Sequence, residues 1–255
     1  MSEIMMSPAV SVVVPAKNEK GNLPDLVRDI QNAFDGHAEA IEIIIVDDGS
    51  DDGSLEVLQA LQTEMDNLRL LSHAQSGGQS AAVHSGTRAA RGRIVCTLDG
   101  DGQNPPLELP NLVAPLLAAD APADLGLVAG QRVNRQDTLS KKWASKAANA
   151  IRSFILKDKT RDTGCGLKAF KREAFLDLPY FDHMHRYLPA LFSMNGYSVA
   201  HVDVTHRERG AGRSNYSNFQ RALVGLVDLF GVAWLIRRRK KARATELGAA
   251  TKGQN

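Results

Sequence analysis

The residues of this chain best suited to chemistry are Asp99, Asp101 and Gln103, which follow directly on a largely apolar run at residues 94–98. Such a run is typical of a buried strand, so both carboxylates would project from its carboxyl end. Glycines on either side of Asp101 permit a tight turn there. Carboxylate and amide oxygens suit Mg2+ or Mn2+, especially where a diphosphate completes the coordination. The stretch therefore predicts a divalent-metal site, and an ordinary Asp/Gly turn after a core strand is the alternative.

Strand-like and helix-like segments alternate along the first half of the chain. Strands are expected at residues 10–14, 41–46, 68–72 and 94–98, and helices end near residues 34, 64 and 90. Short connections between them predict an α/β fold with a doubly wound, mostly parallel sheet. Such sheets bind ligands beyond the carboxyl ends of their strands. The polar loops at residues 15–19, 47–50, 73–79 and 99–103 therefore predict one nucleotide site.

Capping residues and a less regular second half complete the expected elements. Asn22 is expected to cap the first helix, with Pro24 in its first turn. A helix is expected at residues 107–119, and strands at residues 125–129, 167–170 and 199–204. A basic helical segment covers residues 132–157, for which a solvated helix face is the simplest interpretation.

The last expected element is a helix at residues 218–239 with an apolar face and a basic end. The apolar positions are Leu223, Leu226, Val227, Phe230 and Trp234, and the basic block is residues 237–241. Two interpretations stay open: a helix on an anionic membrane surface, or a helix packed on the domain. The domain organisation expected is a catalytic domain at residues 1–217, this helix at 218–241 and a disordered tail at 242–255.

Bulk properties narrow the class of protein. The formal net charge of +2 over 255 residues gives no general affinity for nucleic acid, so no nucleic-acid partner is expected. The two cysteines lack metal-motif spacing, which indicates a reducing compartment. No signal-peptide pattern precedes residue 9, and the longest apolar stretch, 222–236, is shorter than the about 20 residues of a spanning helix. These features predict a soluble or peripheral protein that is cytoplasmic by default.

Three motifs give the chain a family resemblance. They are residues 13–19, 46–50 and 98–106, with further matches at residues 144–149, 162–170 and 209–216. In this order they resemble the inverting family-2 glycosyltransferases of GT-A fold, specifically the polyprenyl- or dolichyl-phosphate sugar transferases, over about residues 9–236. The pattern at 131–137 is similar to the bacterial undecaprenyl-phosphate aminoarabinose transferase type. The resemblance implies metal-dependent, inverting transfer of one sugar from a UDP- or GDP-sugar to a polyprenyl phosphate. It also implies a cytoplasmic protein that is peripheral on the inner face of the cytoplasmic membrane.

The resemblance also implies roles for individual residues. The nucleotide would lie against Pro15, Ala16, Asn18, Glu19, Asp47, Asp48, Gln79, Asp99, Gly100 and Asp101. Asp101 and Gln103 would hold Mg2+ or Mn2+. Catalysis would involve Asp99, Asp101, Arg132, Lys141, Ser145, Lys146, Asp162 and Arg209. Of these, the arginines would meet phosphates, and Ser145 with a neighbouring lysine would receive the lipid phosphate. Asp162 is the available base for a hydroxyl acceptor, although a turn-stabilising role also fits.

Two departures from the family pattern matter. Asn215 follows Ser214 where many members carry lysine, and the spanning helices of most bacterial relatives are missing, which suggests a separate small membrane-spanning partner. Two other functions stay open: a family-2 enzyme acting on a saccharide or lipid hydroxyl, and a nucleotide-sugar-binding subunit without turnover. A nucleotidyltransferase is disfavoured because residues 15–21 lack its glycine-rich basic loop.

Overall fold

The computed structural model of the protein describes residues 8–133, 151–156, 160, 162–205, 218–239 and 242. Within them lies a seven-stranded sheet of order β3-β2-β1-β4-β6-β5-β7. Its strands are β1 (Val10–Ala16), β2 (Ile41–Asp47), β3 (Leu68–Ser72), β4 (Ile94–Thr97), β5 (Leu125–Arg132), β6 (Lys168–Lys171) and β7 (Ser198–Val204). The α/β fold expected from the sequence is confirmed.

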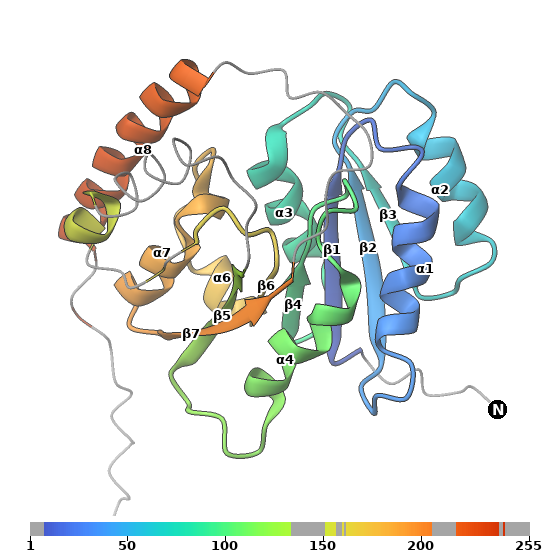
Figure 1. Cartoon of the computed structure of the whole chain (residues 1–255), viewed down its shortest axis with the longest axis horizontal. Helices are drawn as coiled ribbons and strands as arrows, with labels where there is room; N and C mark the ends of the chain where they lie inside the picture. Colours follow the sequence, from blue (N-terminus) through green and yellow to red (C-terminus); the bar gives the residue numbers. More distant parts are fainter. Residues whose placement is uncertain are drawn as a thin grey trace, which may run out of the picture.

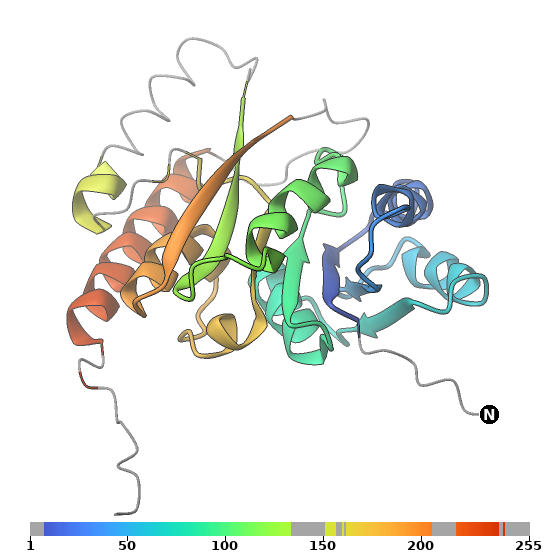
Figure 2. The same cartoon turned by 90° about the horizontal axis from the view of Figure 1, so that it is seen from below.

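Helices cover both faces of this sheet. They are α1 (Leu23–Ala33), α2 (Ser54–Gln62), α3 (Gly78–Ala89), α4 (Leu109–Leu117), α6 (Arg172–Leu176), α7 (Leu188–Met194) and α8 (Asn218–Arg238). Seen from below, α1, α2 and α4 lie on one side of the twisted sheet, and α3, α6, α7 and α8 lie on the other (Figure 2). Helix α8 lies at the end of the molecule opposite α1 and α2 (Figure 1).

The two layers follow from the alternation of side chains along each strand. Val12 and Val14 face one apolar cluster with α1, α2 and α4, whereas Val13 faces a second cluster with α3, α6 and α7. Strands buried on both faces in this way read as continuous β-branched runs, which is what the sequence shows at β1 and β2.

Strand β6 departs from the parallel arrangement, and it shapes the site. Strands β3, β2, β1 and β4 pair in parallel, whereas β6 lies antiparallel between β4 and β5. Thr97 at the end of β4 therefore pairs with Lys168 at the start of β6. Because of this register, the loop that precedes β6 reaches the residues that follow β4. Strand β7 pairs with β5 in parallel, so the sheet as a whole is mostly parallel, as predicted.

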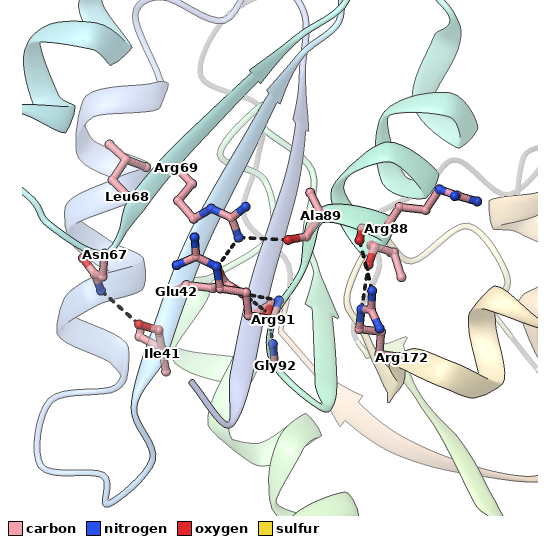
Figure 3. Close-up of polar contacts among 12 residues, drawn as sticks. Ile41, Glu42, Asn67, Leu68, Arg69, Arg88, Ala89, Arg91, Gly92 and Arg172 are labelled. Atoms are coloured by element: carbon pink, nitrogen blue, oxygen red, sulfur yellow. Dashed lines mark hydrogen bonds and ion pairs between the residues drawn. The ribbon is translucent and has the colours of Figure 1, made fainter. Parts of the chain in front are cut away.

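At the amino-terminal ends of the strands, a buried carboxylate connects several elements (Figure 3). Glu42 accepts hydrogen bonds from the Ser11 hydroxyl and the Arg91 N–H, both at 2.6 Å, and forms an ion pair with Arg69 at 2.5 Å. Burial alone raises the pKa of Glu42, but these hydrogen bonds and the Arg69 charge outweigh it and lower the pKa. The cluster fixes β1, β2, β3 and the start of β4 relative to one another, far along the strands from their carboxyl ends.

Three local expectations need correction. Asn22 holds the N-cap position of α1, but its side chain donates to Glu19 at 2.6 Å and caps no helix N–H. Strand β5 runs on to Arg132, three residues beyond the predicted end, because β7 pairs with it along its length. Arg152, expected on a solvated face, is buried and donates to the Thr160 carbonyl.

Helix α8 packs on the domain through one face only. Leu229 and Val232 are buried in the cluster with α7, whereas Phe230 and Trp234 are 61% and 60% exposed. No helix among the described residues combines the length and apolar content needed to cross a bilayer. The predicted disordered tail lies, apart from Ala242, outside the described residues, so the proposed division at residues 217 and 241 stays a prediction.

Candidate active site at the carboxyl end of the sheet

A pocket of about 350 Å³ opens beyond the carboxyl ends of β1 and β4. The segment from Thr163 to Gly166, the start of α3 and the segment before α7 complete its wall. Its lining residues are Pro15, Gln79, Val83, Thr97, Leu98, Asp99, Thr163, Gly164, Cys165, Gly166, Lys168, His185, Arg186 and Leu188. The predicted residues Pro15, Gln79 and Asp99 are therefore brought together here.

Asp99 is held on two sides by amide groups. Gln79 donates to its Oδ1 at 2.6 Å and Asn104 donates to its Oδ2 at 3.2 Å. Burial raises the pKa of the Asp99 carboxyl, and the neighbouring Asp101 raises it further, while Lys168 offsets part of the shift. The amides fix the orientation of the carboxylate without neutralising it.

The loop before β6 packs directly against this carboxylate. A Cβ atom at Gly166 would overlap the Asp99 carboxyl group, so the contact needs a glycine. The Thr97 hydroxyl donates to the Gly166 carbonyl at 2.9 Å, which holds the loop in place. The sequence predicted a strand at residues 167–170 but not this contact, because the contact depends on the antiparallel register of β4 and β6.

Lys168 places a buried ammonium group beside Asp99. The residue is 5% exposed and donates to the Cys165 carbonyl. Burial lowers the pKa of Lys168, and attraction to negative groups, Asp99 among them, offsets part of that effect. Sequence reasoning missed this residue; the one signal was a lysine inside an apolar strand pattern.

Arg132 and Asp162 form a two-pronged ion pair. Arg132 Nε lies 2.7 Å from Asp162 Oδ2, and its Nη2 lies 2.9 Å from Oδ1. The Gly164 N–H also donates to Asp162 Oδ1 at 3.2 Å, which is the turn-stabilising contact considered from the sequence. An aspartate engaged in this way is a poor free base. A phosphate group would have to share Arg132 with Asp162 or displace Asp162 from it.

Asp48 is bound by the loop that leads into α3. Its Oδ2 accepts from the Ser76 hydroxyl at 2.6 Å and the Gly78 N–H at 2.8 Å, and its Oδ1 lies 2.7 Å from His73 Nδ1 and accepts from the Gly77 N–H. Burial raises the pKa of Asp48, but these contacts outweigh it and lower the pKa to about 2. Asp48 therefore organises the 73–78 loop, and its predicted nucleotide contact stays a prediction.

Asp47 differs from its neighbour. Its Oδ2 accepts at 3.4 Å from the Ser50 N–H and the Ser72 hydroxyl. Its Oδ1 is buried and has no hydrogen-bond partner among the described residues. A buried acceptor without a hydrogen-bond donor lowers the stability of the fold. This oxygen is therefore a candidate to accept a hydrogen bond from a ligand.

The first loop is held mainly by protein contacts. Asn18, at a left-handed φ of 56°, donates to Asp51 at 2.8 Å and accepts from the Asp51 N–H. Glu19 accepts from Asn22. Ala16 ends β1, and a Cβ at Gly100 would meet the Pro15 carbonyl at 3.0 Å, so the 99–101 turn lies close on β1. These predicted nucleotide residues therefore lie at, or directly after, the carboxyl end of β1 or pack against it.

Asp101 and Gln103 lie in the turn that follows Asp99. The Gln103 N–H donates to Asp101 Oδ1 at 3.2 Å, and both side chains are partly exposed. No group of three or more His, Cys, Asp or Glu residues within the described part of the chain forms a metal centre. The hard oxygens of this pair fit Mg2+ or Mn2+ only if other oxygens, such as those of a diphosphate, complete the coordination.

The remaining predicted residues are Lys141, Ser145, Lys146 and Arg209, and all four lie outside the described residues. In contrast, His185 and Arg186 line the pocket although the sequence gave them no role. Their only sequence signal was a run of histidine and arginine at residues 183–186, before an apolar helix.

An open, mostly parallel α/β sheet with a pocket beyond its strand ends is the architecture of nucleotide-binding α/β proteins. The model of glycosyl transferase family 2 matches residues 11–178. The chain belongs to this family.

Relatives and solved structures agree with the assignment. The chain is 36% identical, over 222 residues, to the undecaprenyl-phosphate 4-deoxy-4-formamido-L-arabinose transferases of Salmonella choleraesuis and Salmonella typhimurium. The match covers 86% of this chain and 66% of each relative, so the chain spans just under two thirds of their length.

Two solved structures show the same fold. A mannosyltransferase from Pyrobaculum calidifontis, solved with GDP-Man and Mn2+, gives a TM-score of 0.67 at 24% identity, over 94% of this chain and 67% of that one. Glucosyl-3-phosphoglycerate synthase from Mycobacterium tuberculosis, solved with Mn2+, UDP-Glc and phosphoglyceric acid, gives 0.66 at 22% identity, over 89% and 80%. The GT-A fold expected from the sequence motifs is confirmed.

Proposed function

We propose that the protein transfers one sugar from a nucleotide-diphosphate sugar to a polyprenyl phosphate, with inversion, at a membrane surface. The observation that carries the proposal is the pocket in which Asp99, fixed by Gln79 and Asn104, adjoins the 101–103 turn at the strand ends. Support for the acceptor comes from the 36% identical undecaprenyl-phosphate sugar transferases.

The donor would lie along the carboxyl edge of the sheet. Asp47 Oδ1, which has no partner among the described residues, would accept a hydrogen bond from the base or ribose. The other proposed nucleotide contacts lie at the carboxyl end of β1 or against it: Pro15, Ala16, Asn18, Glu19 and Gly100. Asp101 and Gln103 would hold Mg2+ or Mn2+, which would stabilise the charge that builds on the departing diphosphate. Solved neighbours contain Mn2+ with UDP-Glc or GDP-Man, which supports a UDP- or GDP-sugar donor.

The acceptor needs positioning more than activation. A phosphate monoester is ionised near neutral pH, so it attacks without a strong base, and proximity and electrostatics supply most of the catalysis. Arg132 and the residues Lys141, Ser145, Lys146 and Arg209 are proposed to receive phosphate groups. Inversion follows from direct attack of that phosphate on the anomeric carbon.

A hydroxyl acceptor is the second candidate, because family-2 membership alone permits it. It requires a carboxylate base, and Asp162 was the candidate. Its two-pronged pairing with Arg132, at 2.7 and 2.9 Å, holds both carboxylate oxygens and makes this role less suitable.

We place the protein on the cytoplasmic face of the membrane, and helix α8 supports the membrane-surface part of this proposal. Its outward face presents Leu226, Val227, Phe230 and Trp234, and the neighbouring helical turn at 151–156 adds Phe154, which is 85% exposed. Arg237 and Arg238 follow in the last turn of α8. An apolar face with terminal arginines suits an anionic bilayer surface. The small membrane-spanning partner expected from the sequence stays a prediction.

The test is transfer of radiolabelled sugar to undecaprenyl phosphate in detergent. The donors would be UDP-glucose, UDP-4-deoxy-4-formamido-L-arabinose and GDP-mannose, each with Mg2+ or Mn2+. The expected product is extractable into organic solvent and releases its label in mild acid, because glycosyl phosphates hydrolyse readily. Label that is stable to mild acid would favour a hydroxyl acceptor, and absence of transfer from every donor would contradict the proposal.

A further inference from the structure

Ser80 and His185 form a contact at the pocket wall that the proposed reaction does not yet use. His185 Nδ1 lies 2.7 Å from the Ser80 hydroxyl oxygen, and the His185 backbone N–H donates to the same oxygen at 3.3 Å. Ser80 is 1% exposed and lies in the first turn of α3, next to Gln79, which holds Asp99. The contact therefore links the 184–186 turn to the same helix end that orients Asp99.

The contact with Ser80 indicates which nitrogen of the His185 ring carries the proton. The Ser80 hydroxyl has one hydrogen to donate, and buried hydroxyl hydrogens find an acceptor. Among the described residues, His185 Nδ1 is the one acceptor recorded for it. Nδ1 is therefore the unprotonated nitrogen, and in the neutral ring Nε2 carries the hydrogen.

A ligand-sized space adjoins His185. His185 lines the 350 Å³ pocket together with Asp99 and Lys168, and no described residue accepts a hydrogen bond from its Nε2. Burial and the nearby cations Lys168 and Arg186 lower the pKa of His185 to about 3, so the ring stays neutral at working pH. A neutral N–H group in a fixed orientation favours a ligand oxygen at one position. Because it carries no net charge, it does not attract anions in general.

We infer that His185 is a specificity-determining residue that donates its Nε2–H to a hydroxyl or carbonyl oxygen of the donor sugar. The inference rests on the proposed function and names the part of the donor that the pocket holds. The pocket is small, near the lower end of the range for ligand sites, so it suits a monosaccharide better than a whole nucleotide. Asp99 offers carboxylate oxygens in the same pocket. The His185 N–H as hydrogen-bond donor and Asp99 as hydrogen-bond acceptor can therefore both bind hydroxyl groups of the sugar.

The test compares a nucleotide with its sugar derivatives by calorimetry, without acceptor. The probes are UDP against UDP-glucose and UDP-4-deoxy-4-formamido-L-arabinose, and GDP against GDP-mannose, all with Mn2+. His185→Phe removes the donor while keeping a planar ring. It should reduce affinity for the nucleotide sugar about fivefold and leave affinity for the matching nucleoside diphosphate unchanged, since one hydrogen bond contributes about 1 kcal/mol.

Two further variants separate this role from a structural one. His185→Gln retains an N–H donor and should recover part of the lost affinity. His183→Asn is the matched control: His183 is on the same segment but bonds Asp228 of α8 at 3.1 Å, and its left-handed φ of 62° is tolerated by asparagine. This control should leave both affinities unchanged, and thermal unfolding would confirm that each variant is folded.

Equal losses for nucleotide and nucleotide sugar, or no loss with any sugar tested, would overturn the role of His185 while leaving the proposed function intact. A wild-type chain that binds neither nucleotide would overturn both. Tight nucleotide binding without transfer to undecaprenyl phosphate would contradict only the proposed acceptor.

Discussion

Gly166 lies so close to the Asp99 carboxylate that a single methyl group at position 166 would occupy the same space. The contact arises because β6 runs antiparallel to β4 and pairs Lys168 with Thr97. The loop before β6 thus packs directly against the Asp99 carboxylate. The Thr97 hydroxyl holds this loop in place by donating to the Gly166 carbonyl at 2.9 Å. The position of Asp99 depends on a residue that has no functional group of its own.

Gly166→Ala should leave a folded protein that transfers sugar poorly. The added methyl group must push Asp99 or the loop aside, and displacement of an active-site group by about 1 Å can cost about 100-fold in rate. The measurement is kcat/KM in the transfer assay together with the midpoint of thermal unfolding. Gly21→Ala is the control, because nothing lies within 4 Å of a Cβ there. A Gly166→Ala enzyme as active as wild type would show that Asp99 need not hold this position.

Asp101→Ala should lower transfer at least about 100-fold and make residual activity insensitive to added Mn2+. Asp101 and Gln103 are the proposed metal ligands, and the charge on the departing diphosphate would lose its main counter-charge. The assay is repeated with excess chelator on the wild type, where the same loss is expected. Asp120→Ala, an exposed carboxylate elsewhere, serves as control. Full wild-type activity in chelator would rule out the metal role.

Asp48→Asn should destabilise the protein by about 2 kcal/mol at pH 7, because a charged acceptor of four contacts is removed. The folded-state pKa of Asp48, about 2, lies below its ordinary value of 3.8. Its contribution to stability is therefore complete above pH 3.8 and is lost as the pH falls towards 2.

Urea unfolding at pH 7, 5 and 3 measures this effect. The stability difference between wild type and Asp48→Asn should shrink between pH 5 and pH 3. Asp66→Asn, at an exposed position, provides the comparison. A difference that stays constant over this pH range would mean that Asp48 is not the carboxylate responsible.

Much of the fold could be predicted from the sequence, because each buried strand carries its own apolar pattern and each loop its own glycine or aspartate. Residues 68–72 were predicted to be a strand, and β3 has these same bounds. The placement of β6 could not be predicted, because a four-residue segment carries no signal for its partner or direction. For the same reason no individual role was predicted for Lys168 and Gly166, whereas Asp99 was evident from its position directly after the apolar run at residues 94–98.

Helix α8 illustrates the same limit at the surface. Its apolar spacing indicated one face, but spacing alone does not say whether that face is covered. The structure buries Leu229 and Val232 on α7 and leaves Phe230 and Trp234 outward. Asp228, which interrupts the apolar stretch in the sequence, bonds His183 at 3.1 Å on the packed side. Only tertiary packing distinguishes the two faces.

Neutralising Arg237 and Arg238 to glutamine should weaken binding to vesicles of anionic phospholipid about tenfold or more, because each basic residue near such a surface contributes about 1 kcal/mol. Sedimentation with vesicles at low and high salt measures the effect, and the wild-type advantage should fade at high salt. Arg91→Gln with Arg93→Gln is the matched control, since both arginines are exposed but lie at the amino-terminal start of β4.

Phe230→Ser with Trp234→Ser should weaken binding at either salt concentration, because it removes apolar area rather than charge. Sedimentation unchanged by both α8 variants would exclude this helix as the membrane contact.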